Sequence, residues 1–216
     1  MDITWHGNSC FRIIERGMAA LVTDPYDPGV VGFDYGKLRA DVVTVSCDRP
    51  EHNFIKGIRN KAFEITGPGE YEIGGVFITG VWINGSKRKK DSDELPNTIY
   101  VIDYAGMKVA HLGELNSVPS QAEVESLGEV HVALVPVGGE TSLNAAKAAE
   151  VISLIEPSIV IPMHYGTPEN KLPLAPLSKF LKEMGLNQVD TVDALKLSSV
   201  NALEEETRVM VLDLTR

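Results

Sequence analysis

The chain of 216 residues contains no long apolar run, and its longest apolar stretches have the length of strands, as in 40-ADVVTV-45 and 132-VALVPV-137. A membrane-spanning helix needs about 20 apolar residues, and the first residues, MDITWHGN, are too polar for a signal sequence. Cysteine is also scarce, since Cys10 and Cys47 are the only two. Two cysteines cannot form a disulfide framework. We therefore expect a cytoplasmic protein with reduced thiols and no membrane partner.

Basic residues are in deficit, since 20 Lys and Arg stand against 30 Asp and Glu, which gives a formal charge of -10. This charge repels phosphate backbones and acidic membranes, and it argues against nucleic acid as the main partner. The sequence contains no internal repeat and no low-complexity tract. A chain of this length with 44% hydrophobic residues is long enough to bury one core, and we expect residues 1–216 to form a single domain.

The pattern of apolar residues predicts strands in the first half of the chain and an alternation of helices and strands in the second half. Scattered glycines and prolines indicate short elements and tight turns, including a hairpin turn at 103–107 and a turn, not a phosphate-binding loop, at 67–75. Helical spacing appears over 120–127, 143–155 and 174–184, between apolar strands at 130–137, 158–163 and 207–214. This order predicts sheets with helices on their outer faces.

Only five histidines are present, and three of them end or follow an apolar strand: His52, His111 and His164. Strand ends are rigid positions at which enzymes place ligands and catalytic groups. The carboxylates Glu51 and Glu114 lie beside two of these histidines. Imidazoles with adjacent carboxylates suit zinc, manganese or iron, although each histidine taken alone also fits a hydrogen-bonded structural role.

Six landmarks occur in a fixed order: 5-WHGNSCF-11, 22-VTDPYD-27, 47-CDRPEH-52, 111-HLGE-114, 135-VPVGG-139 and 161-IPMHYG-166. In this order they resemble the metallo-β-lactamase superfamily, in particular its compact branch of metal-dependent hydrolases. The resemblance implies an α+β fold, a four-layer αββα sandwich with two mixed sheets, helices outside and the site at one edge. It is also compatible with a homo-oligomer.

The resemblance implies that the first of the family's two metal sites is lost here. In the family, that metal is held by the first two histidines of an H-x-H-x-D-H loop and by the histidine of an H-x-G-D motif. The corresponding residues are Cys47, Arg49 and His111. A guanidinium cannot ligate a metal, because it stays protonated and has no lone pair to give. We therefore expect this first site to be empty.

The second family site corresponds to Glu51, His52, Glu114 and His164, all of them types of residue that can ligate a metal. The resemblance thus implies at most one zinc ion, with manganese or iron as alternatives, and Cys47 is a candidate for an additional thiolate ligand. Two further family histidines are missing. One is replaced by Asn8 in the opening strand. The expected position of the other falls in the stretch 84–86, after the predicted strand at 76–83, where no histidine is present.

Arg49 suggests a physical explanation for the loss of the first metal. Acidic groups that surround a dication repel one another when it is absent, and a fixed cation among them relieves that repulsion. We therefore expect Arg49 to pair with Glu114, Glu51 or Asp48. The alternative is that Arg49 points into solvent from its loop.

The sequence is compatible with two functions from different classes. The first is a hydrolase with one metal ion, acting on a small ester, amide, lactone or phosphoester. Asp48 or His111 would then be the general acid or base, and Arg49 would stabilise developing negative charge. The second is a non-catalytic relative that has lost its metals and serves as a scaffold or as a binding module for a small molecule.

Overall fold

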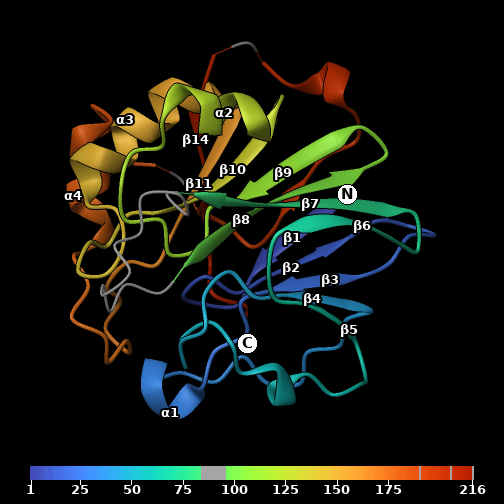
Figure 1. The fold of residues 1–216 in the computed structure, drawn as a ribbon. Coiled ribbons are helices and arrows are strands. Elements are labelled where there is room, and N and C mark those ends of the chain that lie inside the picture. The colour runs from blue at the N-terminus through green and yellow to red at the C-terminus, as the bar shows by residue number, and fades with distance from the viewer. Residues whose placement is uncertain (84–95, 190, 205, 216) are drawn as a thin grey trace.

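The computed structural model describes residues 1–83, 96–189, 191–204 and 206–215. Among these residues, two mixed β-sheets of six and seven strands pack face to face (Figure 1). In spatial order the first sheet contains β13 (Leu195–Lys196), β1 (Asp2–Trp5), β2 (Phe11–Ile14), β3 (Leu21–Thr23), β4 (Val42–Thr44) and β5 (Phe63–Ile65). The second contains β14 (Arg208–Val209), β11 (Ile159–Met163), β10 (Val132–Pro136), β9 (Met107–His111), β8 (Asn97–Tyr104), β7 (Val76–Ile83) and β6 (Gly69–Ile73).

The remaining regular elements are short and lie outside the two sheets. They are α1 (Pro28–Val31), α2 (Gln121–Leu127), α3 (Ala145–Ile155), α4 (Leu177–Glu183), two 3-10 turns at Ile55–Gly57 and Val200–Ala202, and a parallel pair of β12 (Thr191–Val192) with β15 (Val211–Leu212). In the described part of the chain, no helix is long and apolar enough to cross a membrane.

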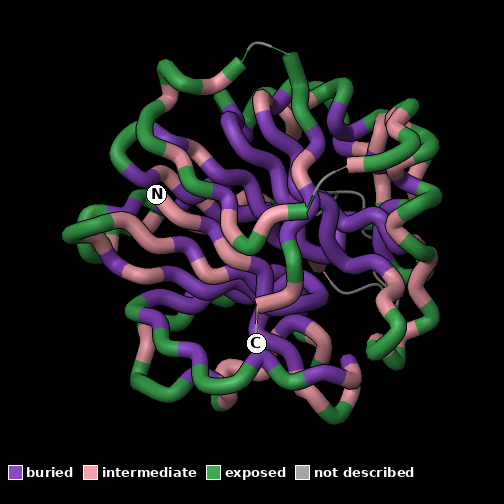
Figure 2. Tube along the Cα trace, turned by 180° about the vertical axis from the view of Figure 1, so that it is seen from behind, coloured by how far each residue is buried: buried purple, intermediate pink, exposed green. Residues whose placement is uncertain are grey.

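The main core lies between the sheets, where buried side chains of the first sheet, such as Ile3 and Ile13, belong to one cluster with those of the second, such as Ile78 and Ile102. Burial follows the strands through the middle of the molecule, and the exposed residues gather at turns and on the outer elements (Figure 2). The prediction of two mixed sheets in a sandwich is confirmed.

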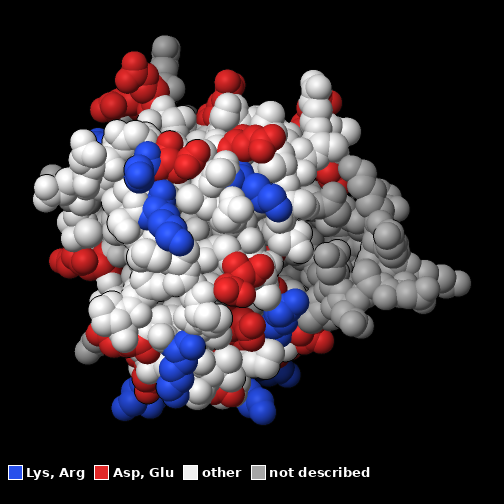
Figure 3. Space-filling view, turned by 90° about the vertical axis from the view of Figure 1, so that its left-hand side faces the viewer, with Lys and Arg blue, Asp and Glu red and all other residues white. Residues whose placement is uncertain are grey.

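The two outer layers differ in kind. The seven-stranded sheet is covered by helices, because α2 contacts β7, α3 contacts β10, and α4 packs on α3 (Figure 1). The six-stranded sheet is covered instead by the short helix α1 and by irregular chain, whose side chains Tyr26, Phe33 and Tyr35 pack edge to face and bury Val22 and Val43. On the face turned toward the viewer in Figure 3, acidic and basic side chains are mixed, and the described residues form no continuous basic area there.

Most expected elements are present within a few residues of their predicted bounds. The hairpin turn at 103–107 joins antiparallel β8 and β9, with Ala105 and Gly106 at positive φ. The prediction of a turn over 67–75 was wrong for most of that run, because β6 occupies residues 69–73 and leaves only the ends as bends and a turn. Its exposed glutamates alternate with half-buried Tyr71 and Ile73, and this edge-strand alternation is obscured by the glycines on both sides.

Two tyrosine hydroxyls on β8 connect the two sheets. Tyr100 donates to the carbonyl of Val45 at 2.9 Å and lies 3.2 Å from that of Ile65, while Tyr104 donates to the carbonyl of Ala19 at 2.7 Å. All of these carbonyls belong to the first sheet or its connections. These hydroxyls add buried polar contacts to the apolar core between the sheets and help to fix how one sheet sits on the other.

We expect Tyr100→Phe to lower the free energy of unfolding by about 1–2 kcal/mol, because buried carbonyls lose a donor. Tyr71→Phe is the matched control, since the Tyr71 hydroxyl lies in a turn at 3.3 Å from the Pro68 carbonyl. Urea unfolding followed by circular dichroism measures both. Equal stability of the two variants would show that the Tyr100 hydroxyl does not hold the sheets together.

Candidate metal centre

Four polar side chains follow the carboxyl ends of strands and meet at one edge of the sandwich. Asp24 comes directly after β3, His52 lies in the loop after β4, Glu114 lies three residues after β9, and His164 comes directly after β11. β3 and β4 are parallel, and β9, β10 and β11 are parallel to one another. Parallel strands end at the same edge, so each sheet contributes two of these side chains to the same place.

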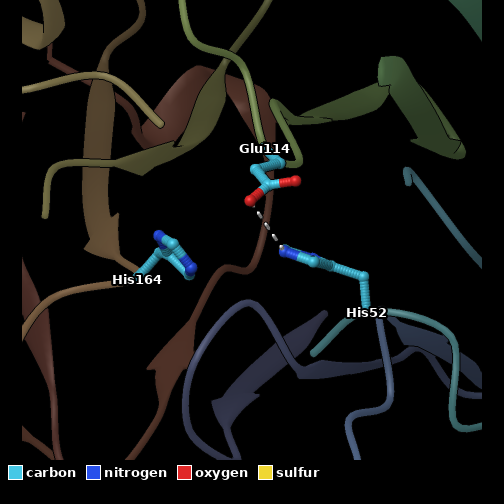
Figure 4. A group of neighbouring side chains, drawn as sticks. All are labelled: His52, Glu114 and His164. Atoms are coloured by element: carbon cyan, nitrogen blue, oxygen red, sulfur yellow. Dashed lines mark ion pairs between the residues drawn. The ribbon is translucent and has the colours of Figure 1, made fainter. Parts of the chain in front are cut away.

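His52, Glu114 and His164 form the group that could hold a metal ion in the described part of the chain. One ligand atom from each lies within 4.8 Å of the others, and all three residues are buried. Figure 4 shows their side chains converging from three different segments. His52 Nε2 is 4.0 Å from Glu114 Oε1, and both atoms are buried without a hydrogen-bond partner among the described residues.

His52 is oriented by the fully buried carboxylate of Asp24. The His52 Nδ1–H donates to Asp24 Oδ2 at 2.8 Å, and the backbone N–H and hydroxyl of Ser46 also donate to Asp24. Burial alone would lower the pKa of His52, but the hydrogen bond and the negative charges of Asp24 and Glu114 outweigh it, so the pKa is raised. A metal ion at Nε2 would replace the proton that this environment favours.

His164 is held in the same tautomer as His52, with the proton on Nδ1, by Ser142. The Ser142 hydroxyl donates to the Gly139 carbonyl at 3.1 Å, so it accepts from His164 Nδ1–H, also at 3.1 Å, and leaves Nε2 with a free lone pair. Burial lowers the pKa of His164 to about 3, and the charges of His52 and Arg49 act in the same direction. His164 is therefore neutral, as a metal ligand must be.

Close backbone packing fixes the position of His164. Its φ of 52° lies in the left-handed region, and its N–H donates to the Asn8 carbonyl at 3.2 Å. A side chain at Gly138 would collide with the His164 carbonyl, so only glycine allows the loop after β10 to approach. Backbone strain of this kind is tolerated where the surrounding structure holds a functional side chain in place.

Arg49 pairs with Glu114, as one of the sequence-based alternatives predicted. Arg49 Nε lies 3.0 Å from Glu114 Oε2, and the side chains are 31% and 4% exposed. The contact is an ion pair and not an aligned hydrogen bond, since the Nε–H has no acceptor in hydrogen-bond geometry. The expectation that Arg49 pairs with a site carboxylate is confirmed.

The residues expected at the first family site do not form a second metal-binding group in the described part of the chain. Cys47 is buried, and that burial together with the charge of Glu114 raises the pKa of its thiol, which disfavours a thiolate. His111 is also buried, and its Nε2–H donates to the Ser9 carbonyl at 2.9 Å. With Arg49 bound to Glu114, these three residues do not offer a metal a set of ligands.

Two other candidate residues, Glu51 and Asp48, are not part of the three-residue group. Glu51 is only half buried and is not part of it, and its backbone carbonyl accepts a hydrogen bond from the Asn8 side chain at 2.9 Å. Asp48 is exposed, and its carboxylate accepts from Asn53. The stretch 84–86, where a further family histidine was expected, lies outside the described residues.

The similarity to known proteins agrees with this geometry. Residues 2–164 match the family model described as a beta-lactamase superfamily domain. A UPF0173 protein of Pyrococcus furiosus is 30% identical over 77% of this chain and 84% of its own length. A UPF0173 metal-dependent hydrolase of Thermoplasma acidophilum is 24% identical over 77% of this chain and 84% of its own length.

The chain belongs to the metallo-β-lactamase superfamily. A crystal structure of a predicted zinc-dependent hydrolase of this superfamily from Thermotoga maritima is 35% identical and has a TM-score of 0.78, with 98% of this chain and 97% of that chain covered. Igni18, a metallo hydrolase of Ignicoccus hospitalis, shares the fold at 17% identity, with a TM-score of 0.65 over 91% of this chain and 99% of that one.

Within this superfamily fold, the described residues fit one metal ion. Two imidazoles and one carboxylate are a donor set known for catalytic zinc, which leaves a further position for water or substrate, and the same set also suits iron(II). Ligands about 2.1 Å from a tetrahedral ion are roughly 3.4 Å apart, so only a small closing movement of these side chains is needed. The unpartnered His52 Nε2 and Glu114 Oε1 are the atoms that such an ion would satisfy.

Asp24, Ser46 and Ser142 are the site residues that the sequence pattern did not single out. The 22-VTDPYD-27 turn served only as a landmark of the family, yet its first carboxylate holds His52. An acidic residue directly after an apolar strand was the signal available for Asp24. Neither serine lies in a recognisable motif, so their contacts follow only from the folded structure.

We expect Asp24→Asn to weaken zinc binding by about 10–100-fold, because the amide no longer fixes the His52 tautomer that leaves Nε2 free. Asp27→Asn is the control, since Asp27 lies in the same turn and caps α1, a role that asparagine also fills. Isothermal titration with zinc compares the two variants with the unmodified protein. Unchanged affinity in Asp24→Asn would contradict the role of Asp24.

Proposed function

We propose that the protein is a hydrolase that uses one divalent metal ion held by His52, Glu114 and His164. The observation that carries the proposal is the pair of buried, unpartnered ligand atoms, His52 Nε2 and Glu114 Oε1, which lie 4.0 Å apart beside His164. Leaving two such atoms unsatisfied in the interior is costly unless a ligand satisfies them. Zinc is the first candidate, and manganese and iron suit parts of the same donor set.

When bound, such an ion supplies a Lewis acid that polarises a substrate oxygen and lowers the pKa of water. The residues of the chain do the rest. Asp24 and Ser142 hold the two imidazoles in the tautomers that expose Nε2. Arg49 supplies a fixed positive charge at Glu114, suited to stabilising negative charge that develops on a substrate oxygen.

General acid or base catalysis falls to Asp48 or His111 under this proposal, and their surroundings differ. Asp48 is exposed at the loop surface and reaches solvent, whereas His111 is fully buried with Nε2 bound to Ser9. A proton acceptor for a solvent-derived nucleophile has to exchange protons with water. This difference favours Asp48 over His111.

A non-catalytic binding module is the second candidate, and the Arg49–Glu114 ion pair is the observation in its favour. A guanidinium next to Glu114 already balances part of the negative charge that a metal would balance. Under this alternative the site would be stable without metal, and it would bind a small molecule without converting it.

The proposal predicts that the metal-stripped protein takes up one equivalent of zinc, and that His164→Ala loses this binding together with any hydrolysis of phosphoester, lactone or ester substrates. His131→Gln is the control, because His131 is buried elsewhere and contacts Lys108 and Glu129. Elemental analysis after dialysis gives the zinc content. A native protein that retains no zinc at micromolar concentrations would favour the non-catalytic module.

Replacing Cys47 and Arg49 together by histidine tests why only one metal is expected. The double variant restores two imidazoles next to Glu114 and removes its cationic partner. We expect the zinc content to rise from one to two equivalents per chain. The single variant Cys47→His keeps Arg49 and should stay at one equivalent, and a value of two in that variant would contradict the role of Arg49.

A further inference from the structure

The two oxygens of Glu114 face different positive positions. Oε2 lies 3.0 Å from Arg49 Nε, and Oε1 lies 4.0 Å from His52 Nε2, next to the candidate metal ligands. The carboxylate therefore lies between the guanidinium and the candidate metal position. Because one carboxylate spans them, the two cationic positions are close enough for a single small anionic group to contact both.

Arg49 has donors left for such a group. Its Nε is buried, yet the side chain as a whole is 31% exposed, so the accessible surface lies on its other atoms. Glu114 engages Nε, and among the described residues no second carboxylate lies within 4.0 Å of Arg49. The two terminal amino groups keep the planar, paired donor arrangement that fits two oxygens of an oxyanion.

The charge of Arg49 reaches into the metal group itself. The guanidinium Nε lies 3.0 Å from Oε2 of Glu114, which is one of the three candidate metal ligands. The buried anions of the site are Asp24 and Glu114. A divalent ion balances these two charges, so Arg49 leaves the loaded site with a net positive charge that attracts an anion.

We propose that Arg49 binds an anionic group of the substrate, and that the substrate is a phosphate ester in place of a neutral ester, amide or lactone. This inference rests on the proposed hydrolase function and narrows its substrate class. A phosphate ester has its charge on the same group as the bond to be cleaved, so its oxygens suit both cationic positions. A neutral carbonyl gives the guanidinium no charge to pair with.

Inorganic phosphate is the probe, measured by isothermal titration with the full-length protein loaded with zinc. We expect Arg49→Gln to weaken phosphate binding at least tenfold and Arg49→Lys, which keeps the charge but loses the paired donors, to weaken it less. Arg16→Gln is the control, because Arg16 is exposed in the turn after β2, at the opposite edge from the site, and should change binding less than twofold.

The zinc content of each sample separates the two levels of the proposal. If the native protein and Arg49→Gln both bind one zinc and bind phosphate equally well, the role of Arg49 is wrong while the metal site stands. If acetate binds as tightly as phosphate and depends equally on Arg49, the phosphoester assignment is wrong. If the native protein binds no zinc, both the hydrolase function and this inference are overturned.

Discussion

Two carboxylates, Asp24 and Glu114, are buried at one edge of the sandwich, and their negative charge has to be balanced inside the protein. An isolated buried carboxylate is far too costly to persist in the charged form. The charge of Asp24 is balanced by His52 and by the two donors of Ser46. Burial by itself would raise the pKa of Asp24. The nearby His111 and His52 and the Ser46 hydroxyl outweigh burial, so the pKa is lowered. Glu114 has Arg49 on one oxygen and an unpartnered second oxygen on the other side.

This charge balance explains why the departures from the family pattern belong together. Because Arg49 lies beside Glu114, its positive charge would repel a second dication at that place. Without that dication, a histidine in place of Cys47 would have no metal to bind. The buried thiol of Cys47 is neutral and adds no further charge. The second metal position keeps its candidate ligands, because His52, Glu114 and His164 still converge. We therefore attribute the expected loss of the first site to the presence of Arg49 beside Glu114.

The fold could be predicted from the sequence because its signals are local and repeated. Alternating or continuous apolar runs such as 76–83 and 158–163 mark strands, and the order of strands and helices predicts layers. The strand β6 was missed because its glycines and exposed glutamates disguise an edge strand. The cover of the six-stranded sheet by irregular chain depends on side-chain packing of Tyr26 with Phe33 and Tyr35, for which the sequence has no periodic signal.

The candidate site could be predicted in part, since His52, Glu114 and His164 each lie at a strand end in a recognisable motif. The partners that orient them could not, because Asp24 and Ser142 lie 28 and 22 residues away in sequence from the imidazoles that they hold. Glu51 illustrates the opposite case. It is adjacent to His52 in the sequence, and yet the structure leaves its carboxylate out of the group.

Under the proposed function, one metal ion and one guanidinium share Glu114. A crystal structure of the zinc-loaded protein, with anomalous scattering recorded at the zinc edge, shows whether they do. We expect one anomalous peak per chain, among His52, Glu114 and His164, with Arg49 still on the second oxygen of Glu114. Two peaks with Arg49 displaced from Glu114, or no peak at saturating zinc, would contradict it.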